Sequence, residues 1–178
     1  MTSYLIDDFA RRVPTAQNLD PACIFCKIVS GEAACHKVHE DEHLMAFLDI
    51  QPIRHGHVLV IPKTHVKRLS DLSPELAAKL GAAVSRIADA LCKGEHISTT
   101  LGITGLNVVC NQEYAQAVPH VHYHIVPAPS LSNGGAGEID PKGKAMLPNA
   151  IFFRELHSRG VLEDSDGTEL SKTIKCRL

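Results

Sequence analysis

The segment 120–127, HVHYHIVP, has a histidine at every second position as far as residue 124. In a β-strand, side chains alternate between the two faces and each residue adds roughly 3.3 Å, so His120, His122 and His124 would share one face over roughly 13 Å. The apolar residues between them would then point into a core. A solvated strand face on which histidine merely recurs is a weak alternative for three histidines, whereas a metal-binding row is a stronger rival. The segment predicts a half-buried strand whose histidine face is a candidate site.

Residues 74–92 carry the clearest helical pattern in the chain. Their apolar side chains recur at spacings of three and four, behind Ser73 as N-cap and Pro74 at the first helical position. Short apolar runs between turn residues predict five strands, two in CHKVHEDEHLMAFLDI and one each in GHVLVIPK, GLNVVCN and HVHYHIVP. Short helices are expected in CIFCKIVSGE, PNAIFFRELHSRG and DGTELSKTIKCRL. These elements predict an α+β fold with an antiparallel sheet, one long helix and a short N-terminal helix.

Length and charge exclude several classes of protein. The 178 residues suit one domain, and 18 Lys and Arg against 20 Asp and Glu give a net charge of −2. We therefore expect no attraction to nucleic acid or to an anionic membrane through bulk charge. The sequence shows neither a signal-peptide core nor a transmembrane run. We expect a polar N-terminal arm over residues 1–21, a domain over 22–130 and a C-terminal extension of loop and short helices over 131–178.

Two of the six cysteines, Cys23 and Cys26, have the spacing of half a tetrahedral zinc site. Two histidines from distant strands would complete a Cys₂His₂ set. A redox pair is the alternative, but it requires a βαβ context that this order of elements does not supply. The other four cysteines have no paired spacing, so reduced thiols are expected. This cysteine usage predicts a cytosolic protein and leaves a nuclear location open.

The run of residues 120–126 also resembles the His-φ-His-φ-His-φ-φ signature of the histidine-triad (HIT) superfamily. Three further stretches, CIFCKIVSGE, AFLDIQPIRHGHVLVIPKTH and LNVVCNQ, are similar to the Hint branch, especially its zinc-containing microbial and fungal forms. The resemblance covers roughly residues 22–130. Because four separated blocks must coincide in order and spacing, the resemblance is specific.

The resemblance implies roles for individual residues. A structural zinc ion would be bound by Cys23, Cys26, His65 and His120 in a closed four-ligand site. His122 would be the nucleophile that attacks an α-phosphate and is transiently nucleotidylated, which is reasonable because neutral imidazole is nucleophilic at cell pH. In this family a backbone carbonyl fixes its tautomer. His124 would hydrogen-bond the phosphate and the leaving group.

A nucleotide pocket is implied in the same way. Asp49 would accept hydrogen bonds from both ribose hydroxyls, and without the resemblance it would be interpreted as a turn residue. Asn111, Gln116 and the N–H group of Ala117 would contact the phosphate, together with His124. The purine slot would be lined by apolar side chains, namely Ile24, Phe25, Ile28, Phe47 and Leu48.

These assignments predict hydrolysis of purine nucleoside phosphoramidates through a nucleotidyl-histidine intermediate, by a homodimer paired through the long helix and a sheet edge. Two alternatives stay open: a dinucleoside polyphosphate hydrolase of the fragile-histidine-triad branch, and a zinc-stabilised nucleotide-binding scaffold with little turnover. The sequence departs from the family pattern in the loop NQEYAQAVP, which contains no glycine and has alanine where many Hint proteins have Ser or Thr.

The remaining histidines are expected outside the site. For His55 and His57, which flank Gly56, we favour a simple turn over a role in the pocket. The others are expected at the surface, namely His36, His39, His43, His96 and His157.

Overall fold

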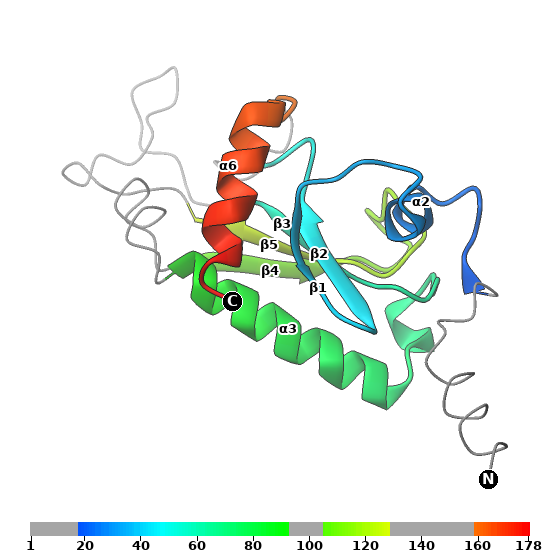
Figure 1. The fold of residues 1–178 in the computed structure, drawn as a ribbon. Helices are drawn as coiled ribbons and strands as arrows, with labels where there is room; N and C mark the ends of the chain where they lie inside the picture. Colours follow the sequence, from blue (N-terminus) through cyan, green and yellow to red (C-terminus); the bar gives the residue numbers. More distant parts are fainter. Residues whose placement is uncertain (1–17, 93–104, 129–158) are drawn as a thin grey trace, which may run out of the picture.

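A five-stranded antiparallel sheet forms the centre of the computed structural model, which describes residues 18–92, 105–128 and 159–178 (Figure 1). The strands lie in the order β1-β2-β3-β5-β4. Their bounds are β1 (Lys37–Glu40), β2 (Leu44–Leu48), β3 (Val58–Pro62), β4 (Leu106–Cys110) and β5 (Tyr123–Pro127). The prediction of an α+β fold on an antiparallel sheet is confirmed.

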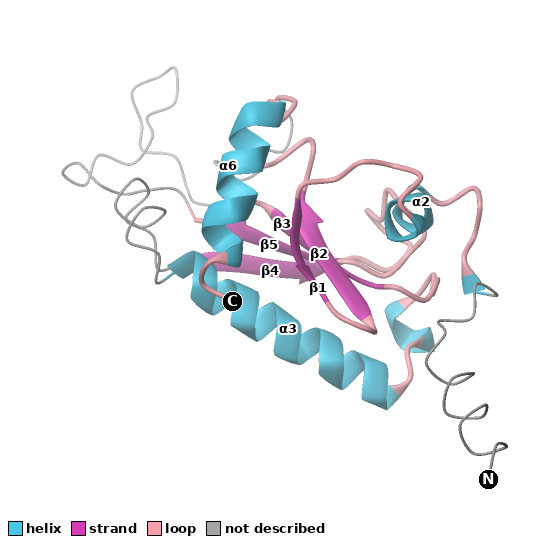
Figure 2. Ribbon diagram, in the orientation of Figure 1, coloured by secondary structure: helices cyan, strands magenta, loops and turns pink. Residues whose placement is uncertain are grey.

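Strands β2 and β3 are buried along their whole length, so each contributes side chains to two apolar clusters. On one face, Leu44 and Val58 belong to a cluster that includes residues of two helices, α3 (Pro74–Cys92) and α6 (Asp164–Lys175). On the other face, Met45 and Leu59 pack with residues of the short helix α2 (Ile24–Ser30). The sheet is therefore covered by helices on both sides (Figure 2).

Helix α3 begins as its sequence predicts. The hydroxyl of Ser73 accepts a hydrogen bond from Leu76 N–H at 3.2 Å, which satisfies one of the free donors of the first turn. Leu80 and Ile87 are fully buried against the sheet, while the polar side chains face outward. Helix α2 ends at Gly31, whose φ of 83° is the left-handed conformation that a glycine adopts without strain.

The C-terminal helix α6 completes the α3 side of the core. Leu170 and Ile174 are buried in the same cluster as β1, β2 and α3. A Cβ atom at Gly167 would lie 2.4 Å from the ring of His36, so the glycine permits the close approach of helix and sheet. His36 is therefore partly covered by α6. The side chains of His36 and His39 are both only partly exposed, so the expectation of surface positions is not met for these two histidines.

The strand predicted around the three histidines is shorter than expected. β5 begins only at Tyr123, so His120 and His122 precede it. In this part the backbone turns to other partners, because His120 N–H donates to Val118 O at 2.8 Å and Val121 N–H donates to Val66 O at 2.7 Å. The rings of His122 and His124 are nevertheless neighbours, with centroids 4.8 Å apart.

Some sequence predictions lie outside the described residues. These are the N-terminal arm over residues 1–17, the helix expected in PNAIFFRELHS, and the surface positions of His96 and His157. Among the residues described, no helix has both the length and the apolar character required to cross a membrane.

The packing of α6 leads to a first prediction. Ile174→Ala removes a fully buried side chain from the main core and should lower the free energy of unfolding by about 2–5 kcal/mol, measured by urea denaturation. Lys175→Ala changes the next, exposed residue of the same helix and should cost less than about 0.5 kcal/mol. Equal stabilities for the two variants would show that α6 does not pack on the sheet in solution.

Candidate active site and metal cluster

Three polar side chains meet on the face of the sheet that α2 covers. Asp49 directly follows β2, His57 directly precedes β3, and His124 lies in β5 opposite Leu59. Because side chains alternate along each strand, all three point to the same face as Leu59. One ligating atom from each of the three lies within 4.8 Å of the others. The antiparallel register therefore assembles a site from three separate strands.

A hydrogen bond between two imidazoles fixes their protonation. His57 Nε2 and His124 Nδ1 are 2.9 Å apart, and Ile53 N–H donates to His57 Nδ1 at 3.2 Å. A neutral imidazole with Nδ1 as acceptor carries its proton on Nε2, so His57 donates to His124. His124 must then accept on Nδ1 and carry its own proton on Nε2. This chain of bonds leaves the Nε2–H of His124 available to a ligand.

Burial keeps the two imidazoles uncharged in the free protein. Burial lowers the pKa of His57 to about 3 and that of His124 to about 4, and neighbouring positive charges act in the same direction. Burial also raises the pKa of Asp49, although a hydrogen bond from Gln51 N–H opposes this rise. The predicted turn is present, because His57 N–H donates to Arg54 O at 3.0 Å and Gly56 has a φ of 88°, but the buried side chain of His57 also belongs to the site, which the sequence did not predict. His55, in contrast, is exposed.

His122 is positioned for a different task. Its Nδ1 lies 2.6 Å from the backbone oxygen of His120, so Nδ1 carries the proton and Nε2 presents a lone pair. Burial lowers its pKa, which favours the neutral ring. The ring packs edge-on against Phe25, with centroids 5.2 Å apart, and its centroid is 4.8 Å from that of His124. A nucleophilic nitrogen and a donor nitrogen therefore come from adjacent rings.

The apolar residues assigned to the purine slot divide between the two faces. Phe25 and Phe47 pack edge-on at 5.6 Å in the α2 cluster, which also includes the partly buried Ile28, while Ile24 is 46% exposed. Leu48 is next to Phe47 in β2, so its side chain points to the opposite face, into the α3 cluster. Assignment of Leu48 to the same slot is therefore incorrect.

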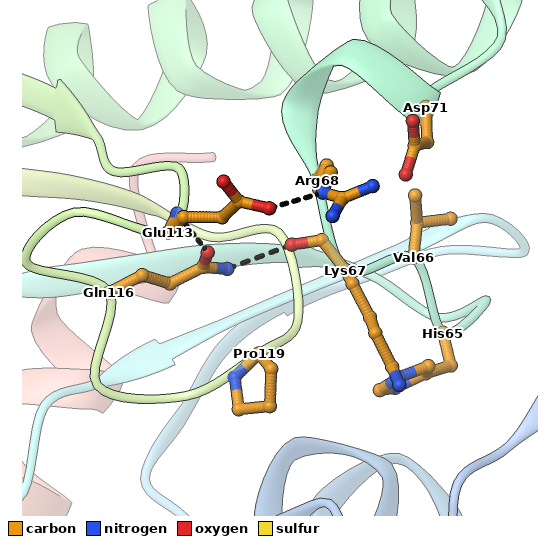
Figure 3. Close-up of a pocket in the computed structure, with 8 residues that line it drawn as sticks. All are labelled: His65, Val66, Lys67, Arg68, Asp71, Glu113, Gln116 and Pro119. Carbon is orange, nitrogen blue, oxygen red and sulfur yellow. Dashed lines mark hydrogen bonds and ion pairs between the residues drawn. The ribbon is translucent and has the colours of Figure 1, made fainter.

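The loop before the triad is held to the segment that leads into η2 (Leu69–Asp71). Gln116 donates to Lys67 O at 2.9 Å and accepts from Glu113 N–H at 2.8 Å, while Arg68 Nε donates to Glu113 at 2.6 Å (Figure 3). The side-chain amide of Gln116 therefore holds the loop in place through these two hydrogen bonds. Without glycine, the loop still uses positive φ at Glu113 (60°) and Ala115 (59°).

The other predicted phosphate contacts lie in the same loop region. Asn111 directly follows β4 and is partly buried, whereas Ala117 is exposed. A separate hollow of about 620 Å³ lies on the side of the loop shown in Figure 3, lined in part by His65, Gln116 and Pro119. Two basic and two acidic side chains also line the hollow, so it has no net charge that would select an anion.

The four predicted metal ligands converge beside this site. Cys23, Cys26, His65 and His120 bring their ligating atoms within 4.8 Å of one another. Cys26 Sγ lies 3.2 Å from His65 Nδ1, and Cys23 Sγ lies 3.5 Å from His120 Nδ1. A tetrahedral zinc ion with ordinary Zn–S and Zn–N bonds requires S···N separations of about 3.6 Å. The spacing and the donor set therefore fit zinc.

Surrounding groups orient these ligands. His120 Nε2 is 2.9 Å from Pro62 O, so Nε2 carries the proton and Nδ1 directs its lone pair at the sulfurs. Asp20 Oδ2 lies 3.7 Å from His65 Nε2. Burial raises the pKa of Cys26 to about 11, which disfavours a thiolate unless a cation stabilises it. A divalent cation bound by the four ligands would therefore stabilise this cluster.

A family model of the HIT domain matches residues 30–130. The chain belongs to the HIT family. Protein hit of Bacillus subtilis is 42% identical over 114 residues, which are 63% of this chain and 74% of that protein. Adenosine 5'-monophosphoramidase hnt1 of Schizosaccharomyces pombe is 39% identical over 115 residues, 64% of this chain and 79% of that protein.

A solved structure of a HIT relative supports the same conclusion. The Zn-bound histidine triad family protein of Mycobacterium smegmatis is 31% identical, with a TM-score of 0.59, and covers 88% of this chain and 92% of its own. The resemblance drawn from the sequence and the predicted fold are both confirmed.

The buried His57 gives a pH-dependent prediction. Its pKa in the folded protein lies below the unfolded value of ~6.5, so stability present above that pH is lost as the pH falls toward the folded value. We expect His57→Gln to flatten the dependence of unfolding free energy on pH by about 1 kcal/mol per unit between about pH 6 and pH 4.5. Urea denaturation over this range measures the slope.

The control for this experiment is the exposed neighbour His55. His55→Gln should keep the wild-type slope, because its ring is exposed. If His57→Gln keeps that slope too, His57 is not held neutral in solution.

Proposed function

We propose that this HIT protein hydrolyses purine nucleoside phosphoramidates, such as adenosine 5′-monophosphoramidate or AMP-lysine, through a nucleotidyl-His122 intermediate. Membership of the HIT family and the similarity to a monophosphoramidase support a nucleotide hydrolase. The observation that carries the proposal is the bond from His122 Nδ1 to His120 O, which leaves a neutral Nε2 lone pair beside the Nε2–H of His124.

In the first step, His122 Nε2 attacks the α-phosphorus and the bond from phosphorus to the leaving amine breaks. A negatively charged phosphate beside His124 favours the protonated form of that histidine, which gives its proton to the amine. The hydrogen bond to His120 O stabilises the positive charge that develops on the ring of His122. The products of this step are the free amine and nucleotidyl-His122.

In the second step, water attacks the same phosphorus and transfers a proton to His124, which restores its protonated form. The bond between phosphorus and His122 breaks and the nucleoside monophosphate leaves.

We propose that Asp49 accepts hydrogen bonds from the ribose hydroxyls and that Ile24, Phe25, Ile28 and Phe47 line the purine slot. Asn111, Gln116, Ala117 N–H and His124 remain the proposed phosphate contacts.

We also infer a homodimer. Strand β4 lies at the edge of the sheet, and Val108 at its centre is 45% exposed. Pairing with a second copy would cover this edge, whose unpaired backbone N–H and C=O groups are otherwise open to pairing with other chains. A cytosolic or nuclear location stays a prediction.

The test of the activity is steady-state hydrolysis of adenosine 5′-monophosphoramidate, compared with diadenosine tri- and tetraphosphate. Wild type should prefer the phosphoramidate, and His122→Ala should lower kcat by at least about 10³-fold, because the nucleophile is lost. His55→Ala serves as the exposed-histidine control and should retain activity. Preference for the dinucleotides, or AMP binding without turnover, would sink the proposal.

We further propose that the metal is a structural Zn²⁺ held by Cys23, Cys26, His65 and His120. Zinc would supply the positive charge that keeps both thiols deprotonated and would tie the start of α2 to the residues just before β5 that include the nucleophile. The combined Cys23→Ser and Cys26→Ser variant should lose bound zinc, measured by elemental analysis, and should melt at a lower temperature.

The control for zinc is Cys176→Ser, which changes an exposed thiol outside the cluster. It should leave zinc content and melting temperature unchanged. Unchanged zinc in the Cys23 and Cys26 double variant would show that the metal lies elsewhere or is held without the thiols.

A further inference from the structure

The C-terminal segment brings an arginine to the active site. Leu162 N–H donates to Ile50 O at 2.8 Å, directly beyond Asp49 at the end of β2. Arg159 lies three residues before this anchor, while α6, after it, packs on the opposite face of the sheet. The segment therefore passes the end of β2 close to Asp49, and Arg159 lies three residues from this point.

The charge of Arg159 acts on the histidine cluster. Burial is the largest influence on the pKa of Asp49, of His57 and of His124, and the positive charge of Arg159 is a further influence that lowers each of them. The corresponding influences on His122 are burial, the bond to His120 O and the charge of Asp49. Arg159 therefore acts on the side of the site formed by Asp49, His57 and His124.

One donor of the Arg159 guanidinium has no hydrogen-bond partner in the described part of the chain. Its Nε is buried and has no hydrogen-bond partner among the described residues. A buried donor without a partner costs about 1–3 kcal/mol, more when the group is charged. This cost is removed when a ligand oxygen accepts the missing hydrogen bond.

The rest of this site lacks a permanent positive charge. His57 and His124 share one proton across their 2.9 Å contact, so the two rings cannot both be cations. Asp49 adds a carboxylate next to them. A phosphate would therefore meet at most one protonated ring, next to an acid, and no permanent positive charge unless a cation is supplied from elsewhere.

We propose that Arg159 binds the α-phosphate of the bound nucleotide beside His124, as a substrate contact supplied by the C-terminal segment. The ligand class rests on the proposed function. The planar fork of a guanidinium matches two phosphate oxygens, and its charge does not depend on pH. The segment from Arg159 to the end of α6 is then part of the active site, with Leu162 and α6 as its anchor.

The experiment measures binding of AMP and of adenosine by calorimetry, to wild type and to Arg159→Ala, Arg159→Lys and Lys172→Ala. The affinity of Arg159→Ala for AMP should fall at least about tenfold, as expected for a lost charged hydrogen bond, while adenosine binding changes little. Arg159→Lys should retain part of the affinity for AMP. Lys172→Ala removes one exposed charge from α6 and should match wild type.

Two results would overturn the inference. One is AMP affinity within about twofold of wild type in Arg159→Ala. The other is an equal loss for AMP and adenosine, because a guanidinium that only positions the segment does not distinguish a nucleotide from its nucleoside. Binding separates this inference from the proposed reaction: wild type that binds AMP through Arg159 but turns over no substrate would refute the hydrolase proposal alone.

Discussion

The antiparallel pairing of β3 with β5 sets the geometry on which both sites depend. Leu59 lies opposite His124, so the residue that enters β3, His57, reaches the third histidine of the triad. At the other end of the same strand, the backbone oxygen of Pro62 lies 2.9 Å from His120 Nε2. The two ends of β3 thus orient the outer two histidines, one through the side chain of His57 just before the strand and one through the backbone of Pro62. A slip of one residue in this pairing would send the side chain of His124 to the opposite face of the sheet.

The two apolar clusters have different roles in the structure. The cluster between the sheet and α3 and α6 is the larger of the two and supplies most of the apolar packing. The cluster under α2 is smaller and includes both cysteines of the metal site. Polar chemistry is therefore confined to the face with less apolar packing, where burial still suffices to keep His57, His122 and His124 neutral.

Much of this arrangement could be predicted from local patterns in the sequence, because apolar or polar residues recur there with the period of a helix or a strand. The periodicity of residues 74–92 located α3 closely, and the alternation of histidines identified the correct face. Short-range rules were less successful where the chain meets distant partners. His57 sits beside Gly56 and suggests a turn, yet it is buried because β5 places His124 against it. Arg159 had no local signal at all, since only the anchor of Leu162 on Ile50 relates it to Asp49.

His120 serves the metal cluster and the chemistry through different atoms. Its ring faces the sulfurs, whereas its backbone oxygen accepts the proton of His122. Every amino acid supplies a backbone oxygen, so the chemistry places no demand on the side chain at this position as long as the backbone is held in place. Natural selection on the side chain at residue 120 should therefore depend on metal binding alone. A chain that stabilised this backbone by other means could exchange the imidazole freely and keep its nucleophile aligned.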